Sequence, residues 1–320
     1  MEKIQAAIAK ARAIRDEQIA AEKQGLPATP EAANDDIATL ERPVPVVAAP
    51  AMPVAEPVAA APVAAPPVEP IVAPAAPALS KAEIKVAWSK LKQVEFQASQ
   101  LKRQRVMTLD QGRDSSYFDV MRTRLLQQCR ANGWTRVGLT SPGANCGKTT
   151  IALNLAFSLS RQPDQLTILA DVDLRKPSLA KLLGLRSKKN FASLLEGKAT
   201  FDECAVRYKK SLAIAANNTS VHNPAELLQS TVAAEALNEV QARYAPTIML
   251  FDMPPMLAGD DVMAFVGQLD CVLIVAAAES TTIKQIDVCE RDLASQTNVL
   301  GVILNKCRYM STDEDYGYYE

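Results

Sequence analysis

Residues 136–156 read RVGLTSPGANCGKTTIALNLA, and this run decides the fold of the chain. It begins as a strand-like stretch, passes through a loop that holds two glycines, and continues from a Gly-Lys-Thr triplet as an amphipathic helix. In this order the backbone N–H groups of the loop and of the helix start point toward one spot, which suits a phosphate group. The run therefore predicts a nucleotide-binding loop between a strand and a helix.

The loop supplies a continuous set of predicted nucleotide contacts. They are Gly143, Ala144, Asn145, Cys146, Gly147, Lys148, Thr149 and Thr150. In such loops the lysine reaches the β- and γ-phosphates, and the hydroxyl of the next residue ligates magnesium. We expect these roles for Lys148 and Thr149. The loop departs from the usual spacing, because Pro142 stands where glycine is usual and Gly143 follows it.

Two apolar runs that read as strands end in aspartate. In the first, Asp171 and Asp173 are two residues apart, so they share one face of the strand end and point toward the nucleotide. The second run, MLFDMPP at residues 249–255, ends in Asp252 and then bends at two prolines. A carboxylate at such a strand end holds magnesium, directly or through water. The predicted metal ligands are therefore Thr149, Asp173 and Asp252.

Short apolar runs alternate with helical patterns from residue 106 onward. The predicted strands are residues 135–140, 166–173, 212–216, 247–252, 271–277 and 300–305, and predicted helices include residues 148–161, 224–243 and 283–295. This alternation predicts an α/β fold with a mostly parallel sheet that is covered by helices on both faces. Ligands of such folds bind at the carboxyl ends of the strands, where the motifs above fall.

The rest of the chain divides into four segments around this domain of residues 106–308. Residues 1–25 predict an amphipathic helix, either solvated or docked on a partner. Residues 26–80 hold thirteen of the 20 prolines, which predicts a disordered, semi-rigid tether or a recruitment site for a proline-binding domain. Residues 81–105 predict a basic amphipathic helix that packs on the domain, contacts a partner or touches anionic lipid. Residues 309–320 are acidic, rich in tyrosine and without period, which predicts a disordered tail.

Composition narrows the function classes. A net charge of −1 argues against a nucleic-acid binder. A single histidine, His222, and six cysteines without a C-x-x-C pair exclude the usual zinc spacings, and we expect reduced thiols in a cytoplasmic protein. No signal peptide is predicted at the start of the chain, and recurrent proline keeps the apolar stretch 43–79 from spanning a bilayer as a helix.

Together these segments resemble the bacterial tyrosine kinases of capsule and exopolysaccharide biosynthesis, the CpsD/CapB-like autokinases. This family is related to the deviant-Walker P-loop ATPases that position septa and plasmids. Its first pattern, apolar–Asp-x-Asp-x-Arg, matches Asp171, Asp173 and Arg175, and its second, apolar–Asp-x-Pro-Pro, starts here at Asp252. A third family stretch appears as NPAELL at residues 223–228, and the resemblance extends over about residues 116–308.

Departures from the family pattern refine the resemblance. The septum- and plasmid-positioning relatives carry an extra lysine inside the loop, and its absence here favours the kinase branch. The family's Glu-x-x-Arg-x-x-Arg helix, which builds ring oligomers, aligns with Ser116, Asp119 and Arg122, so only the last arginine remains. P-loop proteins that bind guanine recognise the base with an Asn-Lys-x-Asp motif, and Arg308 stands here in place of its Asp, which favours adenine. The resemblance places Asn305 near that base.

The resemblance implies an ATP- and Mg²⁺-dependent protein-tyrosine autokinase that regulates polymer length and export. The implied phosphoacceptors are Tyr309, Tyr316, Tyr318 and Tyr319. In this hypothesis Lys148 holds ATP, Asp171 accepts the tyrosine proton with Asp173 assisting the metal, and Arg175 orients the acidic pair.

Implied partners are a separate membrane chain-length regulator as activator, further copies of the chain and a cognate phosphatase, at the inner face of the cell membrane. The alternative is a MinD/ParA-like module that binds ATP and recruits partners without phosphorylating tyrosine. A soluble small-molecule kinase is a third, less favoured interpretation.

Overall fold

The computed structural model describes residues 79–109, 112, 115–162 and 164–308. The predicted N-terminal helix, nearly all of the predicted tether and the tyrosine-rich tail lie outside these residues. The four predicted phosphoacceptor tyrosines therefore lie outside them as well.

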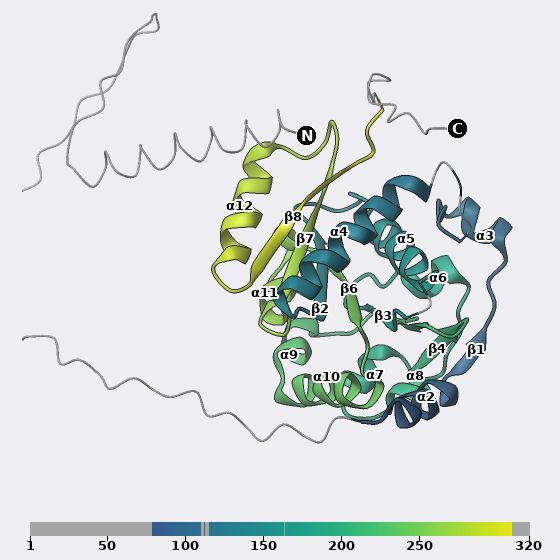
Figure 1. Cartoon of the computed structure of the whole chain (residues 1–320). Coiled ribbons are helices and arrows are strands. Elements are labelled where there is room, and N and C mark those ends of the chain that lie inside the picture. Colours follow the sequence, from purple (N-terminus) through teal and green to yellow (C-terminus); the bar gives the residue numbers. More distant parts are fainter. Residues whose placement is uncertain (1–78, 110–111, 113–114, 163, 309–320) are drawn as a thin grey trace, which may run out of the picture. The chain divides into compact units, whose positions relative to one another are not determined.

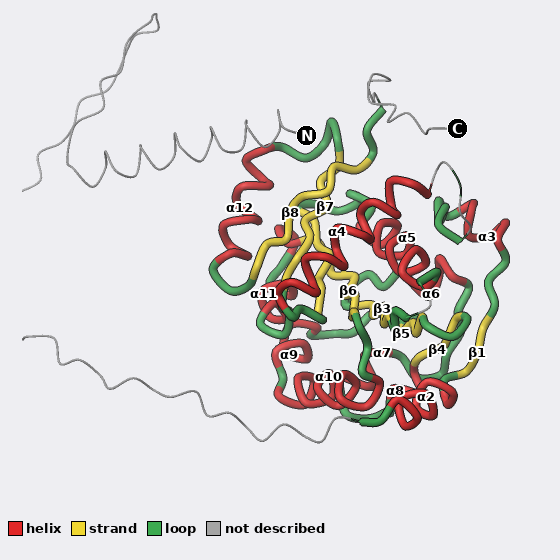
Figure 2. Tube along the Cα trace, viewed as in Figure 1, coloured by secondary structure: helices red, strands yellow, loops and turns green. Residues whose placement is uncertain are grey.

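An eight-stranded sheet forms the centre of the described part of the chain (Figure 1; strands yellow in Figure 2). Its strand order is β1-β4-β5-β3-β6-β2-β7-β8. The strands are β1 (Lys92–Val94), β2 (Arg136–Ser141), β3 (Thr167–Asp171), β4 (Ala205–Tyr208), β5 (Leu212–Ala215), β6 (Ile248–Pro255), β7 (Cys271–Ala277) and β8 (Asn298–Asn305). Every neighbouring pair is parallel except β4–β5, so the predicted mostly parallel sheet is confirmed.

Helices cover both faces of the sheet. They are α2 (Lys81–Lys90), α3 (Ala98–Arg103), α4 (Ser116–Asn132), α5 (Lys148–Ser160), α6 (Leu179–Leu183), α7 (Phe191–Leu195), α8 (Phe201–Cys204), α9 (Pro224–Gln229), α10 (Thr231–Tyr244), η2 (Met256–Ala258), α11 (Asp261–Val266) and α12 (Ile283–Ala294). Successive side chains of β3 point to opposite faces of the sheet and enter two different hydrophobic cores. Ile168 and Ala170 pack in a core with α2, α7, α10, α11 and α12, and Leu169 packs in a second core with α3, α4, α5 and α6.

The register of three neighbouring strands sets up the site. β6 lies between β3 and β2, and Asp252 is the register partner of Asp171 on one side and of Leu139 on the other. Since β2 runs directly into the predicted phosphate loop, both aspartates end up beside that loop. Parallel strands bring their carboxyl ends to one edge, which is why motifs far apart in sequence meet here.

The structure differs from the predicted helix over residues 81–105. A capping box at Ser80 starts α2, but the helix ends at Lys90 and the chain becomes extended at Leu91, continues as β1 and re-enters a helix at α3. The indole Nε1 of Trp88 donates to the carbonyl of Tyr244 at 2.8 Å, which fixes α2 on α10. Pairing of β1 with β4 therefore replaces helical hydrogen bonds with sheet hydrogen bonds at this point.

A second difference lies in the predicted helix 224–243. The structure breaks it at Ser230, which is the C-cap of α9 and the N-cap of α10, and the Ser230 hydroxyl accepts from the backbone N–H of Ala233. Serine is favoured at such a cap because its oxygen satisfies a free N–H of the first turn.

Candidate nucleotide site

The predicted phosphate loop is present between β2 and α5, and two left-handed residues shape it. Gly147 has φ 95° and Asn145 has φ 61°, so the loop folds back before the helix starts. A Cβ atom on Gly147 would lie 2.2 Å from the Nδ2 atom of Asn305, which leaves room only for glycine. That same Nδ2 donates to the carbonyl of Cys146 at 2.8 Å.

Asn305 therefore holds the loop backbone from the end of β8. Sequence reasoning placed this residue near adenine, and the structure shows its amide nitrogen on the loop. Arg308, whose presence favoured adenine over guanine, lies 3.5 Å from the carboxylate of Glu279.

The departure at Pro142 does not open the loop. The carbonyl of Gly143 accepts from the Ser141 hydroxyl at 2.7 Å and from the Cys146 thiol at 3.3 Å, so the loop closes around one carbonyl. The carbonyl of Pro142 accepts from the backbone N–H of Leu257 at 3.2 Å, which ties the loop to the segment after β6.

Lys148 and Thr149 open α5, where the helix N-terminus favours a negative ligand. The Lys148 side chain is buried, with 7% of its surface exposed. The Thr149 hydroxyl lies 3.1 Å from the Ser178 hydroxyl. Ser178 is the N-cap of α6, yet its side chain makes no capping hydrogen bond, so its hydroxyl is free to contact Thr149.

Two buried carboxylates face this helix start. Asp171 and Asp252 have no exposed surface, and none of their four carboxylate oxygens has a hydrogen-bond partner among the described residues. An ionised carboxylate without partners is costly to bury, so such a pair marks a place where a cationic ligand belongs.

The surroundings raise the pKa values of all three predicted acidic residues. Burial, followed by the charges of Asp252 and Asp173, raises the pKa of Asp171 well above its ordinary value. Burial raises the pKa of Asp252 to about 7, against the opposing effects of Thr149 and Lys148. Burial also raises the pKa of Asp173, and Lys148 opposes this shift.

Asp173 and Arg175 lie on the loop that follows β3. The Asp173 carboxylate accepts from the backbone N–H of Lys176 at 3.0 Å. Arg175 forms a two-pronged ion pair with Asp261 of α11, at 2.5 and 2.9 Å, and lies 3.6 Å from Asp260. The guanidinium of Arg175 thus contacts α11, whereas the sequence suggested that it orients the acidic pair.

The residues present fit a magnesium ion that arrives with a nucleotide. Magnesium prefers oxygen ligands and commonly takes only one or two carboxylates beside phosphate oxygens and water. Thr149 and Asp252 offer such oxygens, and the oxygens of Asp252 have no competing partner. No cluster of three or more metal-binding side chains occurs among the described residues.

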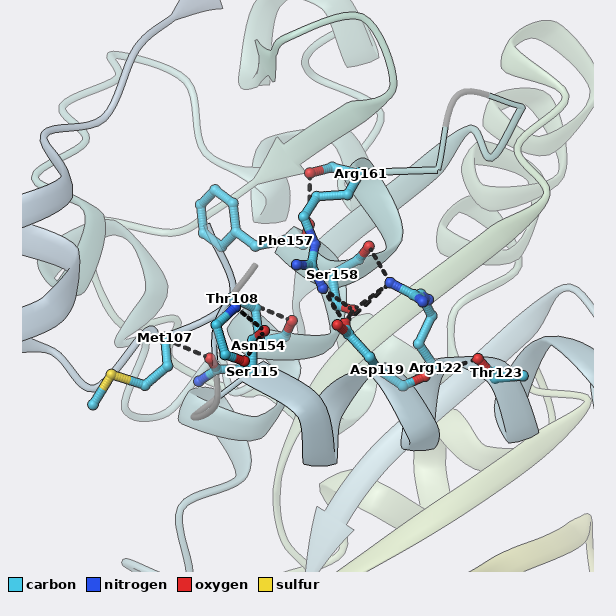
Figure 3. A network of polar contacts seen from close by, with 12 residues as sticks. Met107, Thr108, Ser115, Asp119, Arg122, Thr123, Asn154, Phe157, Ser158 and Arg161 are labelled. Carbon is cyan, nitrogen blue, oxygen red and sulfur yellow. Dashed lines mark hydrogen bonds and ion pairs between the residues drawn. The ribbon is translucent and has the colours of Figure 1, made fainter. Parts of the chain in front are cut away.

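A second polar cluster lies between α4 and α5 (Figure 3). The Asp119 carboxylate accepts from Arg122 at 3.1 Å, from the Ser158 hydroxyl at 2.7 Å and from the guanidinium of Arg161. Arg122 also donates to the carbonyl of Ser158 at 3.3 Å. Asp119 and Arg122, which align with the family's oligomer motif, therefore make contacts within the chain.

Sequence reasoning missed three contacts of the site. They are the Ser178 hydroxyl on Thr149, the Asp261 carboxylate on Arg175, and the Nδ2 atom of Asn217, which donates to the carbonyl of Asp171 at 2.8 Å. Each contact joins segments far apart in sequence, so no local spacing of residues predicts it.

The strand predicted to end at Asp252 continues through both prolines to Pro255, so Asp252 lies inside β6. The sheet order, the phosphate loop and the two buried aspartates define a P-loop NTPase. A family model described as ParA, NUBPL iron-transfer P-loop NTPase, matches residues 137–318. The match extends over more than half of the chain, and the chain belongs to this family.

Similar proteins within this fold are bacterial tyrosine kinases, so the predicted resemblance is confirmed. The tyrosine-protein kinase Wzc of Salmonella typhi is 33% identical over 189 residues, which cover 57% of this chain and 25% of that protein. The tyrosine-protein kinase YwqD of Bacillus subtilis (strain 168) is 29% identical over 215 residues, which cover 67% and 89%. The crystal structure of the VpsO kinase domain has 31% identity and a TM-score of 0.53, and covers 60% of this chain and 96% of that domain.

The match to Wzc spans about a quarter of that protein's length. Within the part of the chain that the structure describes, no helix has the length and apolar character needed to cross a membrane.

Proposed function

We propose that this chain is an ATP- and Mg²⁺-dependent protein-tyrosine autokinase that phosphorylates its own tyrosine-rich tail. The observation that carries the proposal is the pair of buried, unpartnered carboxylates, Asp171 and Asp252, beside the phosphate loop. One such carboxylate suits the metal of a bound nucleotide, and the second is available for proton transfer. The similarity to named tyrosine kinases supports the same activity.

Positioning and charge neutralisation supply most of the catalysis in phosphoryl transfer. Lys148 and the loop N–H groups, up to Thr150, bind the phosphates. Thr149, Asp252 and Asp173 would hold the metal, which would supply positive charge to neutralise the transferring phosphate. Asp171 accepts the proton of the tyrosine hydroxyl as the tyrosine oxygen bonds to the γ-phosphorus and the bond to the β-phosphate oxygen breaks.

The acceptors we propose are Tyr309, Tyr316, Tyr318 and Tyr319. Asn305 ends β8 on the phosphate loop, and the first of these tyrosines follows four residues later in the sequence. Each phosphate adds about −1.5 to −2 charges. On an acidic tail this charge favours release from a neighbouring copy.

The kinase would act in exopolysaccharide or capsule polymerisation and export. We propose a separate membrane chain-length regulator as its activator, further copies of the chain as substrates, and a phosphatase that resets the tail. In this arrangement the partner holds the kinase at the inner face of the membrane.

The second candidate is an ATP-switched binding module of the MinD/ParA type. Its support is that Asp119 and Arg122 are occupied within the chain, so the contacts that would present the tail to a neighbour are altered. Such a module needs neither Asp171 as a base nor the tyrosines.

The test is incubation of the full chain with Mg-ATP followed by mass spectrometry of the tail, with and without membranes of the source cell. Lys148→Ala is the control, because it removes the phosphate contact. Phosphate on the tail that disappears in the control supports the kinase. ATP turnover with an unmodified tail under both conditions supports the switch.

A further inference from the structure

One edge of the sheet carries a dense group of cations. β1 is the outermost strand, and it joins α2 to α3 (Figure 1). Residues 79–106 hold seven basic and two acidic residues, although the whole chain has a net charge of −1. The register of Val94 with Tyr208 brings Lys209 and Lys210 to the same edge, because they follow Tyr208 in the turn between β4 and β5.

We call this surface the basic edge. Its members are Lys81, Lys85, Lys90, Lys92, Lys102, Arg103, Arg105, Lys209 and Lys210. All nine side chains are exposed, and among the described residues none of them forms an ion pair with an acidic side chain. Their charge is therefore available to a partner.

The residue types favour a diffuse anionic surface as that partner. Arginine presents a planar fork that grips one phosphate or carboxylate with two hydrogen bonds, whereas lysine is a point charge on a flexible stem. Seven of the nine members are lysines that lie on two helices, a strand and a turn. Recognition of a single phosphotyrosine would need arginines that converge on one point.

Apolar side chains lie among these cations. On α2, Val86 is 56% exposed between Lys85 and Lys90, and Leu79 before the helix is 38% exposed. Cations mixed with exposed aliphatic groups suit the headgroup region of a lipid bilayer, where the charges meet phosphates and the apolar groups enter the boundary of the acyl chains. A soluble acidic peptide offers no such apolar layer.

Protection of the sheet edge explains only part of the pattern. Lysine on an outer strand prevents pairing with other sheets, and this accounts for Lys92 on β1. The lysines on α2 and in the β4–β5 turn do not lie on that strand.

We propose that the basic edge binds anionic lipid surfaces directly. This contact goes beyond the proposed kinase activity and uses no residue of the nucleotide site. The bilayer would meet the chain at the β1 edge, and the attraction would fall with salt, because charges at a surface are screened within about 10 Å at 0.1 M.

The experiment is co-sedimentation of the full chain with phosphatidylglycerol–phosphatidylcholine vesicles and with pure phosphatidylcholine vesicles. The test variant is Lys92→Gln/Lys209→Gln/Lys210→Gln. Each lysine near an anionic surface contributes about a fivefold change in affinity, so the triple should bind about 100-fold more weakly. A second variant, Lys81→Gln/Lys85→Gln/Lys90→Gln, changes only α2 and serves if the first fails to fold.

The matched control removes three exposed cations elsewhere, Lys284, Arg291 and Arg130, by change to glutamine. Residues 1–78 are unchanged in every variant, so any lipid contact they make cancels. Lys148→Ala should bind vesicles as the unchanged protein does, which separates this test from that of the kinase.

Binding that needs phosphatidylglycerol, weakens with salt and is lost in the edge variants but not in the control supports the proposal. Equal binding by edge and control variants would overturn it, as would absence of binding to either vesicle. If a soluble peptide with the sequence of the acidic tail saturated the basic edge with the same affinity as the vesicles, the proposal would also be overturned, because the edge would then be a peptide site.

Discussion

Two clusters in this chain, one around Asp119 and one formed by Asp171 and Asp252, differ in whether their carboxylates have hydrogen-bond partners. Asp119 accepts from two arginines and a serine between α4 and α5, and about a quarter of its side chain is exposed. Asp171, the last residue of β3, and Asp252, inside β6, are fully buried register partners, and within the described part of the chain none of their carboxylate oxygens has a hydrogen-bond partner. Satisfied polarity holds two helices together, whereas unsatisfied polarity is tolerated where a ligand supplies the missing partners.

The largest effect that sharpens this comparison is expected from Asp171→Asn. The amide has nearly the same shape but cannot accept the tyrosine proton, so tail phosphorylation should fall by about 10²- to 10⁴-fold. The free energy of unfolding should stay equal or rise, because the change removes an unpaired buried acid. Mass spectrometry measures the phosphorylation rate, and urea unfolding measures the free energy of unfolding. Full activity in this variant would remove Asp171 from the mechanism.

The next largest effect should be the loss, in Asp252→Asn, of a pH dependence of stability that the unchanged protein shows. The pKa of Asp252 is about 7 in the fold and 3.8 as a free side chain, so the unfolded chain ionises first. The stability that this raised pKa confers is fully present below pH 4 and is lost as the pH rises through 7, by roughly a few kcal/mol.

Urea unfolding in chelator from pH 4 to 8 should show the unchanged protein losing stability relative to Asp252→Asn over this range. Parallel pH curves for the two proteins would mean that Asp252 ionises in the fold as it does in water.

A smaller loss, in stability alone, is expected from Asp119→Ala. The change leaves Arg122 and Arg161 without their shared acceptor, and the cost should be about 2 kcal/mol because the cluster is partly exposed. Thr123→Ala on the same helix is the control, and an exposed change of this kind costs within about 0.5 kcal/mol. Denaturant midpoints give both values. ATP binding per folded molecule should be unchanged, and its loss would link α4 to the site.

The smallest effect should come from Ser178→Ala. A Thr149 hydroxyl that gives its lone pair to a metal must direct its proton to an acceptor, and the Ser178 oxygen lies 3.1 Å away. Loss of this acceptor should raise the magnesium concentration needed for nucleotide binding about fivefold, or about 1 kcal/mol. Ser178→Thr keeps the hydroxyl and should restore the magnesium dependence. Identical titrations for all three proteins would assign Ser178 a role in the loop only.

Much of the fold could be predicted because its signals are local. Cys271–Ala277 matches the predicted strand at both ends, and the phosphate loop with its following helix lies where Gly147 and Lys148 indicated. Buried parallel strands are continuous apolar runs, and glycine with lysine at a helix start has few other uses.

The features that could not be predicted depend on partners far away in sequence. Leu91 and Val94 continue the helical spacing of α2, so the local pattern favoured one helix, and only β4 reveals that the segment is a strand. Asn305 contacts the carbonyl of Cys146 across 159 residues, and Asp119 meets Ser158 across 39. Periodicity describes which side of an element is buried, not which element it meets.

The order of synthesis delays the pairing of the edge strand β1 with its neighbour β4. Gln93 and Arg207 are neighbours in the sheet but lie 114 residues apart, so β1 leaves the ribosome long before β4 exists. At about 5–20 residues per second this delay is roughly 6–23 s. During that time Trp88 and Leu91, which are buried in the finished protein, have no core to enter. The start of this domain is thus expected to stay unpaired until β4 is made, and β1 should be among the last strands to join the sheet.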